Sequence, residues 1–434
     1  MNTFSKYNIF SKIKDSDNYF IINLLSGSAD ILEPEEAASF EKHQRLEHTD
    51  YIAKGYVVNE AEEKKVYKNA YLKFVSEREQ DEVQLFFVPT YSCNFACTYC
   101  YQDEYNPTKK ELNNEIIDAF FAYVKKHFAN RRKYITIFGG EPLLDTPKQR
   151  EHIEYFINKC KEFKIDLAFV TNGYTLAQYV PILASAPVRE IQVTIDGTAS
   201  IHNKRRYLKG GKETFDKITD GVDLCLKNNL NVNLRMVVDK ENIEDLPELA
   251  KFAIEKGWTK SEYFKTQLGR NYELHHCQEQ SDRLFSRISL YETIFNQIKL
   301  NPEILEFHKP AYSIAKFLSE NGELPSPLFD SCPGGKTEWA FDYTGNIYSC
   351  TATVGKSGEE LGTFYPTESI DNEKVELWEQ RDVLSIEECK NCAVQLACGG
   401  GCGSVAKNKN GHLHTPDCRP VKELLEMGIN LYFD

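Results

Sequence analysis

The sequence has no apolar run long enough to cross a bilayer, and its first ten residues, MNTFSKYNIF, contain no apolar core of a signal peptide. Basic residues are outnumbered: 52 Lys and Arg stand against 65 Asp and Glu, for a formal net charge of -13, and no basic stripe stands out. These absences argue against a membrane protein, a secreted protein and a nonspecific nucleic-acid binder. We therefore expect a cytoplasmic protein that acts on neither membranes nor nucleic acids.

Cysteine, in contrast, is abundant, with 13 residues in a chain of 434. Without a secretory signal, thiols at this density indicate metal ligands more readily than disulfides. A chain of this length also exceeds one ordinary hydrophobic core, so we expect two or three domains.

Three of the thiols lie within one short loop. Cys93, Cys97 and Cys100 form the pattern CxxxCxxC directly after the apolar, strand-like run Val83–Val88. A closed four-iron cluster normally takes four thiolates, so three would leave one iron open to another ligand. Zinc is the alternative, but a zinc site usually takes four ligands in paired CxxC knuckles, and no His lies near this loop.

With aromatic Tyr99 before its last thiol, the loop resembles the CxxxCxΦC motif of radical S-adenosylmethionine (SAM) enzymes. The resemblance implies that the open iron binds the amino and carboxylate groups of SAM, whose sulfonium bond is cleaved to a 5′-deoxyadenosyl radical. Tyr99 is then counted among the cofactor-binding residues.

Strand-like and helical patterns alternate from residue 83 to about 267, which predicts βαβ units and a parallel sheet. The strand-like runs are 83–88, 134–138, 167–170, 191–195, 232–238 and 263–267. Six such units match the α/β fold that the resemblance implies, a partial (β/α)6 barrel, which we assign to residues 79–280. Residues 281–327 read as a helical bridge.

The turn after the second predicted strand, Gly139-Gly140-Glu141-Pro142, resembles the GGEP motif of the same family. Glycines at 139 and 140 would let the backbone approach the methionine part of SAM closely. Glu141 or a backbone carbonyl would accept hydrogen bonds from its ammonium group.

Later strand ends carry further polar residues. By the resemblance, Thr171 or Asn172 lies near the ribose or methionine, and Asp196 begins a DG…HxxxR stretch. Arg206 is our candidate for pairing with the methionine carboxylate, with Arg205 as the alternative. His202 is more typical of a turn or core histidine than of a catalyst.

Seven more cysteines lie in the last hundred residues, which we assign to a domain at 328–434. They are Cys332, Cys350, Cys389, Cys392, Cys398, Cys402 and Cys418. Their spacing, C-x12-G-x4-C through Gly345 and then CxxCx5CxxxC, resembles the SPASM domain of radical SAM enzymes that mature peptides. A zinc ribbon is the alternative.

The resemblance implies two auxiliary four-iron clusters with interleaved ligands. Cys389, Cys392, Cys398 and Cys418 would complete one cluster, while Cys332, Cys350 and Cys402 would hold the other. The second set is one thiolate short, and its fourth position would be vacant or filled by water, a substrate thiol or Cys277. Together with the first loop this gives three [4Fe-4S] clusters. Cys160 and Cys225 read as buried apolar residues.

Residues 1–78 are predicted to form a small separate domain. Two short strand-like runs, Tyr7–Ile13 and Tyr19–Leu24, precede a predicted helix at Glu33–His43. This order resembles the winged-helix-like domain that captures the leader of a precursor peptide as an added strand. The alternative is a cap that only shields the barrel.

Together these resemblances imply a peptide maturase that abstracts hydrogen from a ribosomally made precursor and forms a thioether or carbon–carbon crosslink. Its electron donor would be a flavodoxin or ferredoxin. The alternatives are a formylglycine-forming sulfatase maturase, a peptide epimerase and an inactive iron–sulfur electron carrier. Sulfatase maturases carry an Asp directly after the GxxxxC cysteine, whereas here that position is Thr351 and the nearest upstream carboxylate is Asp342. No general base is assigned.

Overall fold

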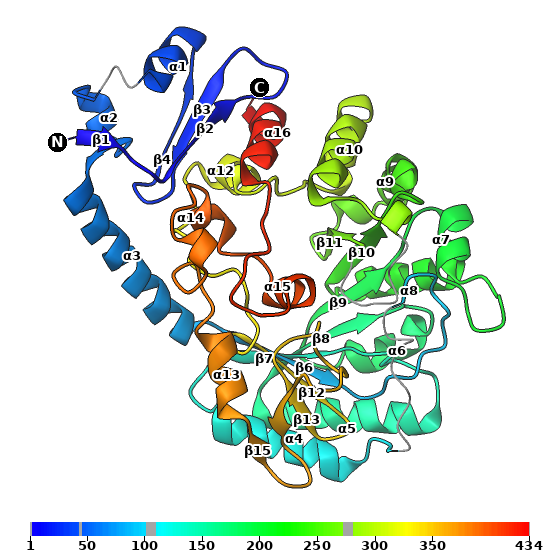
Figure 1. Cartoon of the computed structure of the whole chain (residues 1–434). Coiled ribbons are helices and arrows are strands. Elements are labelled where there is room, and N and C mark those ends of the chain that lie inside the picture. Colours follow the sequence, from blue (N-terminus) through cyan, green and yellow to red (C-terminus); the bar gives the residue numbers. More distant parts are fainter. Residues whose placement is uncertain (1, 43–45, 101–109, 272–280, 434) are drawn as a thin grey trace.

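A computed structural model describes residues 2–42, 46–100, 110–271 and 281–433. Its largest element is a ten-stranded sheet in the order β11-β10-β9-β8-β7-β6-β12-β13-β14-β15 (Figure 1). Six consecutive strands run parallel in chain order: β6 (Val83–Val88), β7 (Lys133–Ile137), β8 (Asp166–Thr171), β9 (Val188–Thr194), β10 (Val232–Val238) and β11 (Phe264–Arg270). The predicted α/β fold with a parallel sheet is confirmed.

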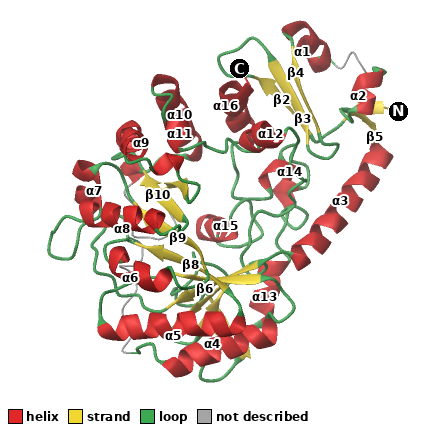
Figure 2. Ribbon diagram, turned by 180° about the vertical axis from the view of Figure 1, so that it is seen from behind, coloured by secondary structure: helices red, strands yellow, loops and turns green. Residues whose placement is uncertain are grey.

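Helices connect these strands and cover the outer face of the sheet (Figure 2). They are α4 (Asn114–His127), α5 (Pro147–Phe163), α6 (Leu176–Leu183), α7 (Ala199–Arg205), α8 (Phe215–Lys227) and α9 (Leu246–Glu255). In α4 the side chain of Asn113 caps the first turn by accepting from the Ile116 N–H. Apolar side chains at helical spacing, such as Ile117 and Phe120, then pack on the sheet.

The strands have two different faces. Leu85 and Phe87 of β6 point into the helix-covered core, where the Phe87 ring lies 4.8 Å from that of Phe120. The alternate residues Gln84 and Phe86 face a cavity inside the barrel. One strand thus serves both the core and a ligand-sized space.

The cysteine-rich region adds four strands to the barrel sheet: β12 (Glu338–Asp342), β13 (Asn346–Tyr348), β14 (Glu360–Thr363) and β15 (Ser369–Ile370). β12 lies parallel to β6, with Phe341 opposite Phe87, and β13 returns antiparallel. β12 covers what would otherwise be an open sheet edge at β6. The predicted segment 328–434 therefore continues the sheet of the barrel.

The amino-terminal residues form two small antiparallel sheets, β1 (Asn2–Phe4) with β5 (Val57–Asn59), and β2 (Asn8–Lys12), β3 (Tyr19–Asn23) and β4 (Ser28–Leu32). Three helices, α1 (Pro34–Glu41), α2 (Thr49–Ala53) and α3 (Glu60–Gln80), complete this part. Ile9 and Phe20 share a hydrophobic core with Leu425 of the last helix, α16 (Val421–Phe433). The Tyr67 and Tyr71 rings of α3 pack on Phe329. Residues 1–78 thus pack on the cysteine-rich region.

Six further α-helices follow the barrel strands among the described residues. They are α10 (Arg287–Leu300), α11 (Ile304–Phe307), α12 (Ala315–Asn321), α13 (Asn372–Glu379), α14 (Gln395–Cys398) and α15 (Gly403–Asn410). In the described part of the chain, no helix is both long and apolar enough to span a membrane.

Candidate active site

A cavity of about 700 Å³ occupies the interior of the barrel. Polar side chains from the inner faces of the strands line it: Gln84, Thr136, Gln192, Thr194 and Arg235. Cys93, Cys97 and Cys100 also line it, together with Tyr99 of the same loop. The fold therefore opens the three-thiol motif onto a space large enough for a small cofactor.

Backbone hydrogen bonds hold the cysteine loop against the end of α7. The N–H of Ala96 donates to the Tyr207 carbonyl at 2.9 Å, and the N–H of Thr98 donates to the Arg205 carbonyl at 3.0 Å. Burial raises the pKa of the Cys93 thiol to about 11, and the nearby Glu141 carboxylate adds to this shift. A thiolate here needs a positive partner, which a bound iron would supply.

The two glycines of the GGEP turn pack against the cysteine loop. A Cβ on Gly140 would lie 2.2 Å from the Ser92 carbonyl oxygen, and one on Gly139 would lie 2.7 Å from that of Thr90. Gly139 also has φ +138°, in the region that favours glycine. Both glycines line the cavity, and their missing side chains let the turn and the thiol loop approach closely.

Glu141 lies behind the cavity wall and is fully buried. Its carboxylate accepts from the Thr171 hydroxyl at 2.7 Å and from the Asn172 and Leu143 N–H groups at 2.6 and 2.8 Å. Burial raises its pKa, although these three donors oppose the shift. Glu141 is not among the lining side chains, so in this structure it joins the GGEP turn to the end of β8, while Thr171 and Asn172 do line the cavity.

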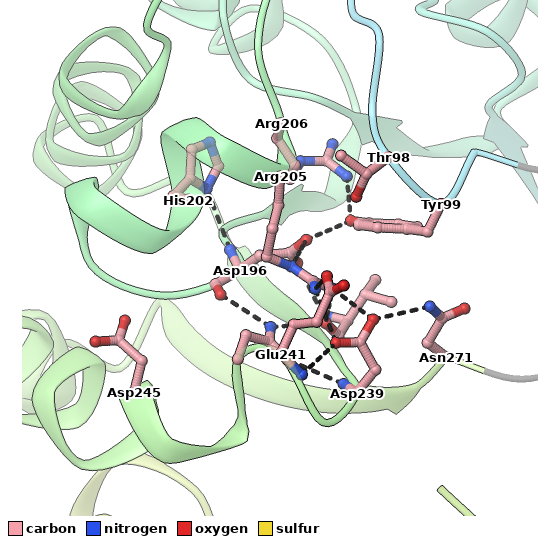
Figure 3. Close-up of polar contacts among 12 residues, drawn as sticks. Thr98, Tyr99, Asp196, His202, Arg205, Arg206, Asp239, Glu241, Asp245 and Asn271 are labelled. Atoms are coloured by element: carbon pink, nitrogen blue, oxygen red, sulfur yellow. Dashed lines mark hydrogen bonds and ion pairs between the residues drawn. The ribbon is translucent and has the colours of Figure 1, made fainter. Parts of the chain in front are cut away.

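Tyr99 links Arg206 to Asp196 (Figure 3). Its hydroxyl donates to Asp196 at 2.5 Å and accepts from Nη1 of Arg206 at 2.6 Å. Arg206 lines the cavity, and its Nε is buried without a hydrogen-bond partner among the described atoms. Asp196 is fully buried, and its Oδ1 accepts from the Val237 N–H at 3.0 Å. Asp196 therefore supports Tyr99 from behind the cavity wall.

Arg205 lies in an ionic cluster that the sequence did not reveal (Figure 3). Its guanidinium donates to both carboxylate oxygens of Asp239, at 2.8 and 3.0 Å, and to Glu241 at 3.0 Å. Arg283 and Asn271 also donate to Asp239, at 2.8 and 3.0 Å. Burial alone would raise the pKa of Asp239, but these hydrogen bonds and the Arg205 charge lower it. Since Arg205 does not line the cavity, the geometry favours Arg206 over Arg205 as the carboxylate partner.

His202 is a buried structural residue. Its Nδ1 accepts from the Asp196 N–H at 3.2 Å, and its Nε2 lies 3.2 Å from the Thr214 hydroxyl (Figure 3). Burial lowers its pKa well below the usual range, and the charges of Arg206 and Arg205 add to that effect. These contacts agree with the predicted core role.

The seven carboxyl-terminal cysteines separate into two groups in space. Cys332 and Cys402 lie near enough to Cys350 that their charges add to the effect of burial, which raises its pKa. Burial likewise raises the pKa of Cys389 to about 12, with contributions from Cys398, Cys392 and Cys418. The fold thus brings the thiols of each predicted set near one another, and their role as cluster ligands stays a prediction.

Neither group has the compact geometry of a single-ion site. Among the described residues, no three His, Cys, Asp or Glu side chains are placed to hold one metal ion. Cys160 and Cys225 are fully buried in the barrel core, and Cys277 lies outside the described residues.

A partly buried carboxylate that the sequence did not indicate lies beside Thr351. Oε1 of Glu338, on β12, accepts from the Thr351 N–H at 2.9 Å, and Thr351 lines the cavity. Burial raises the pKa of Glu338. Asp342 is engaged elsewhere, since it accepts from the Tyr91 hydroxyl at 2.8 Å and the Thr344 N–H at 2.9 Å. The antiparallel pairing of β12 with β13 brings this carboxylate, twelve residues upstream of Cys350, next to Thr351.

Comparisons with known sequences agree with this geometry. Residues 87–253 match the sequence model of the Radical SAM superfamily. The chain is similar to GTP 3′,8-cyclase of Campylobacter jejuni, with 31% identity over 173 residues, which cover 38% of this chain and 51% of the relative. GTP 3′,8-cyclase of Nautilia profundicola is 30% identical over 176 residues, covering 39% and 52% of the two chains. The chain thus spans about half the length of these curated relatives.

Solved structures resemble a larger part of the chain. The structure described as native anSMEcpe with bound AdoMet has 20% identity and a TM-score of 0.62, and the match covers 81% of this chain and 99% of that one. Streptococcus suis SuiB bound to precursor peptide SuiA has 16% identity and a TM-score of 0.55, with 97% and 99% covered. At these identities the likeness concerns the fold, and it extends over both ends of the chain.

Proposed function

Residues 87–253 match the sequence model of the Radical SAM superfamily, and from that match we propose that this chain is a radical SAM enzyme that modifies a peptide. It abstracts hydrogen from a residue of a ribosomally made precursor and forms a thioether or carbon–carbon crosslink. In this proposal, residues 1–78 recognise the leader and residues 79–280 form the radical SAM barrel. Residues 281–327 are a bridge to the SPASM domain at residues 328–434.

One observation carries the proposal: a single cavity is lined by both cysteine-bearing regions. Cys93, Cys97 and Cys100 line it from one side, and Thr351, directly after Cys350, lines it from another. A substrate held there lies between two groups of thiols. This arrangement suits an oxidation of the substrate in which one electron passes to a second redox centre at the carboxyl-terminal thiols.

The residues fit the expected cofactor. Arg206 Nε and Arg235 Nε are buried donors without a hydrogen-bond partner among the described atoms, and both side chains line the cavity. Buried, unpaired guanidinium donors are costly, and a carboxylate would satisfy them. When bound, SAM and the four-iron cluster at Cys93, Cys97 and Cys100 supply a hydrogen-abstracting 5′-deoxyadenosyl radical.

The protein contributes position and shielding. Tyr99 and Asp196 hold the Arg206 guanidinium at the cavity wall, and Glu141 fixes the Asn172 backbone that ends β8. Walls such as Phe86 and Phe138 are apolar and keep water from the reacting groups.

Two auxiliary [4Fe-4S] clusters fit the remaining thiols. Cys389, Cys392, Cys398 and Cys418 offer four ligands, whereas Cys332, Cys350 and Cys402 offer three. The incomplete set lies nearer the barrel, because Cys350 precedes the cavity-lining Thr351. An iron with an open position there would bind a substrate thiol, which favours thioether formation.

A peptide substrate is favoured over a nucleotide by the extent of the likeness. The matches to GTP 3′,8-cyclases stop at about half of those chains. The fold shared with SuiB, a protein solved with a precursor peptide, covers 97% of this chain and includes residues outside the barrel. The edge strand β4 offers a place where a leader peptide adds as a further strand.

The test is anaerobic co-expression with short precursor peptides encoded beside this gene, read by mass spectrometry. Loss of two hydrogens from the peptide supports crosslinking, and cleavage patterns locate the bond. Conversion of a cysteine to an aldehyde would support formylglycine formation instead, and deuterium uptake from heavy water without other mass change would support epimerisation. Purified protein that forms no 5′-deoxyadenosine with reductant, SAM and peptide would refute the proposal. The reductant in the cell is proposed to be a flavodoxin or ferredoxin in the cytoplasm.

A further inference from the structure

A second cavity, of about 750 Å³, lies between the barrel and the carboxyl-terminal region. Its walls come from β11, α10, residues 308–316 and α16, and Figure 1 shows α16 beside α10 and α12. Cys402, one of the proposed cluster ligands, also lines it. Arg270 lines both this cavity and the one inside the barrel, so the two spaces share a wall.

The charge of this cavity is opposite to that of the whole chain. Five basic side chains line it, namely Arg270, Arg287, Lys309, Lys316 and Arg419, and none of its lining residues is Asp or Glu. The chain as a whole has a net charge of -13, so this concentration of positive charge is local. We name it the basic cavity.

Part of this positive charge is not compensated within the described structure. Arg287 forms an ion pair with Asp417 at 2.9 Å, and Lys316 lies 3.9 Å from Glu320. Lys309 and Arg419 form no ion pair with any described residue. His308 adds no charge at neutral pH, because burial and the neighbouring Lys316 lower its pKa to about 4.

A second feature of the same wall points to a ligand. Ser313 lines the cavity, and its hydroxyl is buried without a hydrogen-bond partner among the described atoms. Both Tyr312 and Ser313 have positive φ, +42° and +61°, which is strained for residues other than glycine. A buried unpaired hydroxyl on a strained segment is costly, and such features concentrate at binding sites.

Aliphatic side chains line the cavity as well. They are Leu290, Ile294, Leu396, Val405 and Leu424. An occupant of the cavity therefore needs carboxylates for the basic side chains, a polar group for the Ser313 hydroxyl, and apolar side chains for these aliphatic residues. A peptide segment that mixes acidic and aliphatic residues meets all three requirements.

We propose that the basic cavity binds an acidic, partly aliphatic segment of the peptide substrate and leads the chain past Cys402 and Arg270 toward the barrel cavity. This inference rests on the proposed peptide-modifying function and specifies its substrate class. The recognition would be separate from leader binding at β4.

The test uses the holoprotein with its clusters, kept anaerobic, and three fluorescein-labelled decapeptides. These alternate Leu with Glu, with Gln or with Lys, and binding is followed by fluorescence anisotropy. We expect the Glu peptide to bind tightest, and to weaken as salt rises because its contacts are charged. The proposal is wrong if the Gln peptide or the Lys peptide binds as tightly as the Glu peptide. It is also wrong if GTP displaces the labelled Glu peptide at a lower concentration than the unlabelled Glu peptide does.

Variants locate the site. Lys309→Glu with Lys316→Glu should weaken binding of the Glu peptide by about tenfold, since two attractions become repulsions. Lys309→Gln with Lys316→Gln removes the charges without adding new ones and should show a smaller loss. The matched control is Lys227→Glu, an exposed residue at the end of α8, which should bind the peptide like the unaltered protein. Unchanged affinity in both double variants would refute the assignment.

The outcome is separable from that of the proposed function. Binding is measured without reductant or SAM cleavage, so an inactive enzyme that still binds the Glu peptide at this site would keep the inference and reject the reaction. If the Lys309→Glu, Lys316→Glu variant modifies a natural precursor at unchanged KM, the proposed reaction is kept and the binding role of the basic cavity is rejected.

Discussion

The two cysteine-bearing regions of this molecule are built in different ways. The thiols of Cys93, Cys97 and Cys100 come from one loop and open onto a cavity. Those of the carboxyl-terminal region come from segments far apart in sequence, and most are buried, as in Cys332, where the exposed fraction is 5%. A site that keeps a position open for an exchangeable ligand can therefore be encoded within one short loop. A set of thiols from segments far apart in sequence requires the whole domain to fold around it.

The largest expected effect is on the open loop. Cys97→Ala should abolish formation of 5′-deoxyadenosine and remove about four iron atoms per chain. Chromatography of the SAM products and iron analysis measure these losses. Cys160→Ala, at a cysteine fully buried in the barrel core, is the matched control: it should keep its iron and lose only about 1 kcal/mol of stability. If Cys97→Ala still forms 5′-deoxyadenosine, the three-thiol loop is not the site of SAM cleavage.

The next effect separates the two regions. Cys350→Ala should remove one auxiliary cluster, again about four iron atoms, yet leave cleavage of SAM in the absence of peptide largely intact. Crosslinking of the peptide should be lost. Electron paramagnetic resonance of the reduced protein and mass spectrometry of the peptide follow the two outcomes. Zinc in place of iron in the unaltered protein would overturn the cluster assignment for both regions.

Neighbouring arginines give a third contrast. Arg206→Lys should weaken SAM binding by about tenfold, because an ammonium cannot offer two parallel donors to a carboxylate. Arg205→Gln should instead destabilise the fold by about 3 to 5 kcal/mol, since it leaves Asp239 buried with one guanidinium fewer. Equilibrium dialysis and thermal unfolding distinguish the two. Lys204→Ala, exposed on the same helix, is the control for both measurements.

The smallest effect concerns the amino-terminal residues. Deleting them cannot test leader binding, because α3 is tied to the cysteine-rich region through Tyr67, Tyr71 and Arg78. A point change at β4 is cleaner. Ile31→Asp, at an exposed residue of that edge strand, should weaken binding of the full precursor by a few-fold, about 1 kcal/mol, and spare a leaderless core peptide.

The control for this change is Leu72→Asp, because Leu72 is equally exposed but lies on α3. Fluorescence anisotropy with both peptides measures the difference. Equal losses for the full precursor and the leaderless peptide would favour the view that these residues only shield the molecule.

Much of the barrel could be predicted because its signals are local. Each predicted strand is present with ends shifted by a few residues, as at β9, which begins at Val188 where we expected Ile191. Helix α7 was not expected, because its seven residues carry too short a periodic pattern. The resemblance to SPASM domains implied which thiols belong together, and the same thiols are neighbours in the structure.

The parallel α/β sheet and the three-thiol loop were predictable from the chain alone, because periodicity and spacing are local properties, whereas the division of the remaining cysteines followed from the family resemblance. Folding places β12 beside β6 in the barrel sheet. It also turns Arg206 toward the cavity while Asp239 holds Arg205, and it brings five basic side chains together in one cavity. These arrangements depend on contacts between residues far apart in sequence. Burial and charge pairing stabilise such contacts, but they produce no local pattern from which the contacts could be predicted.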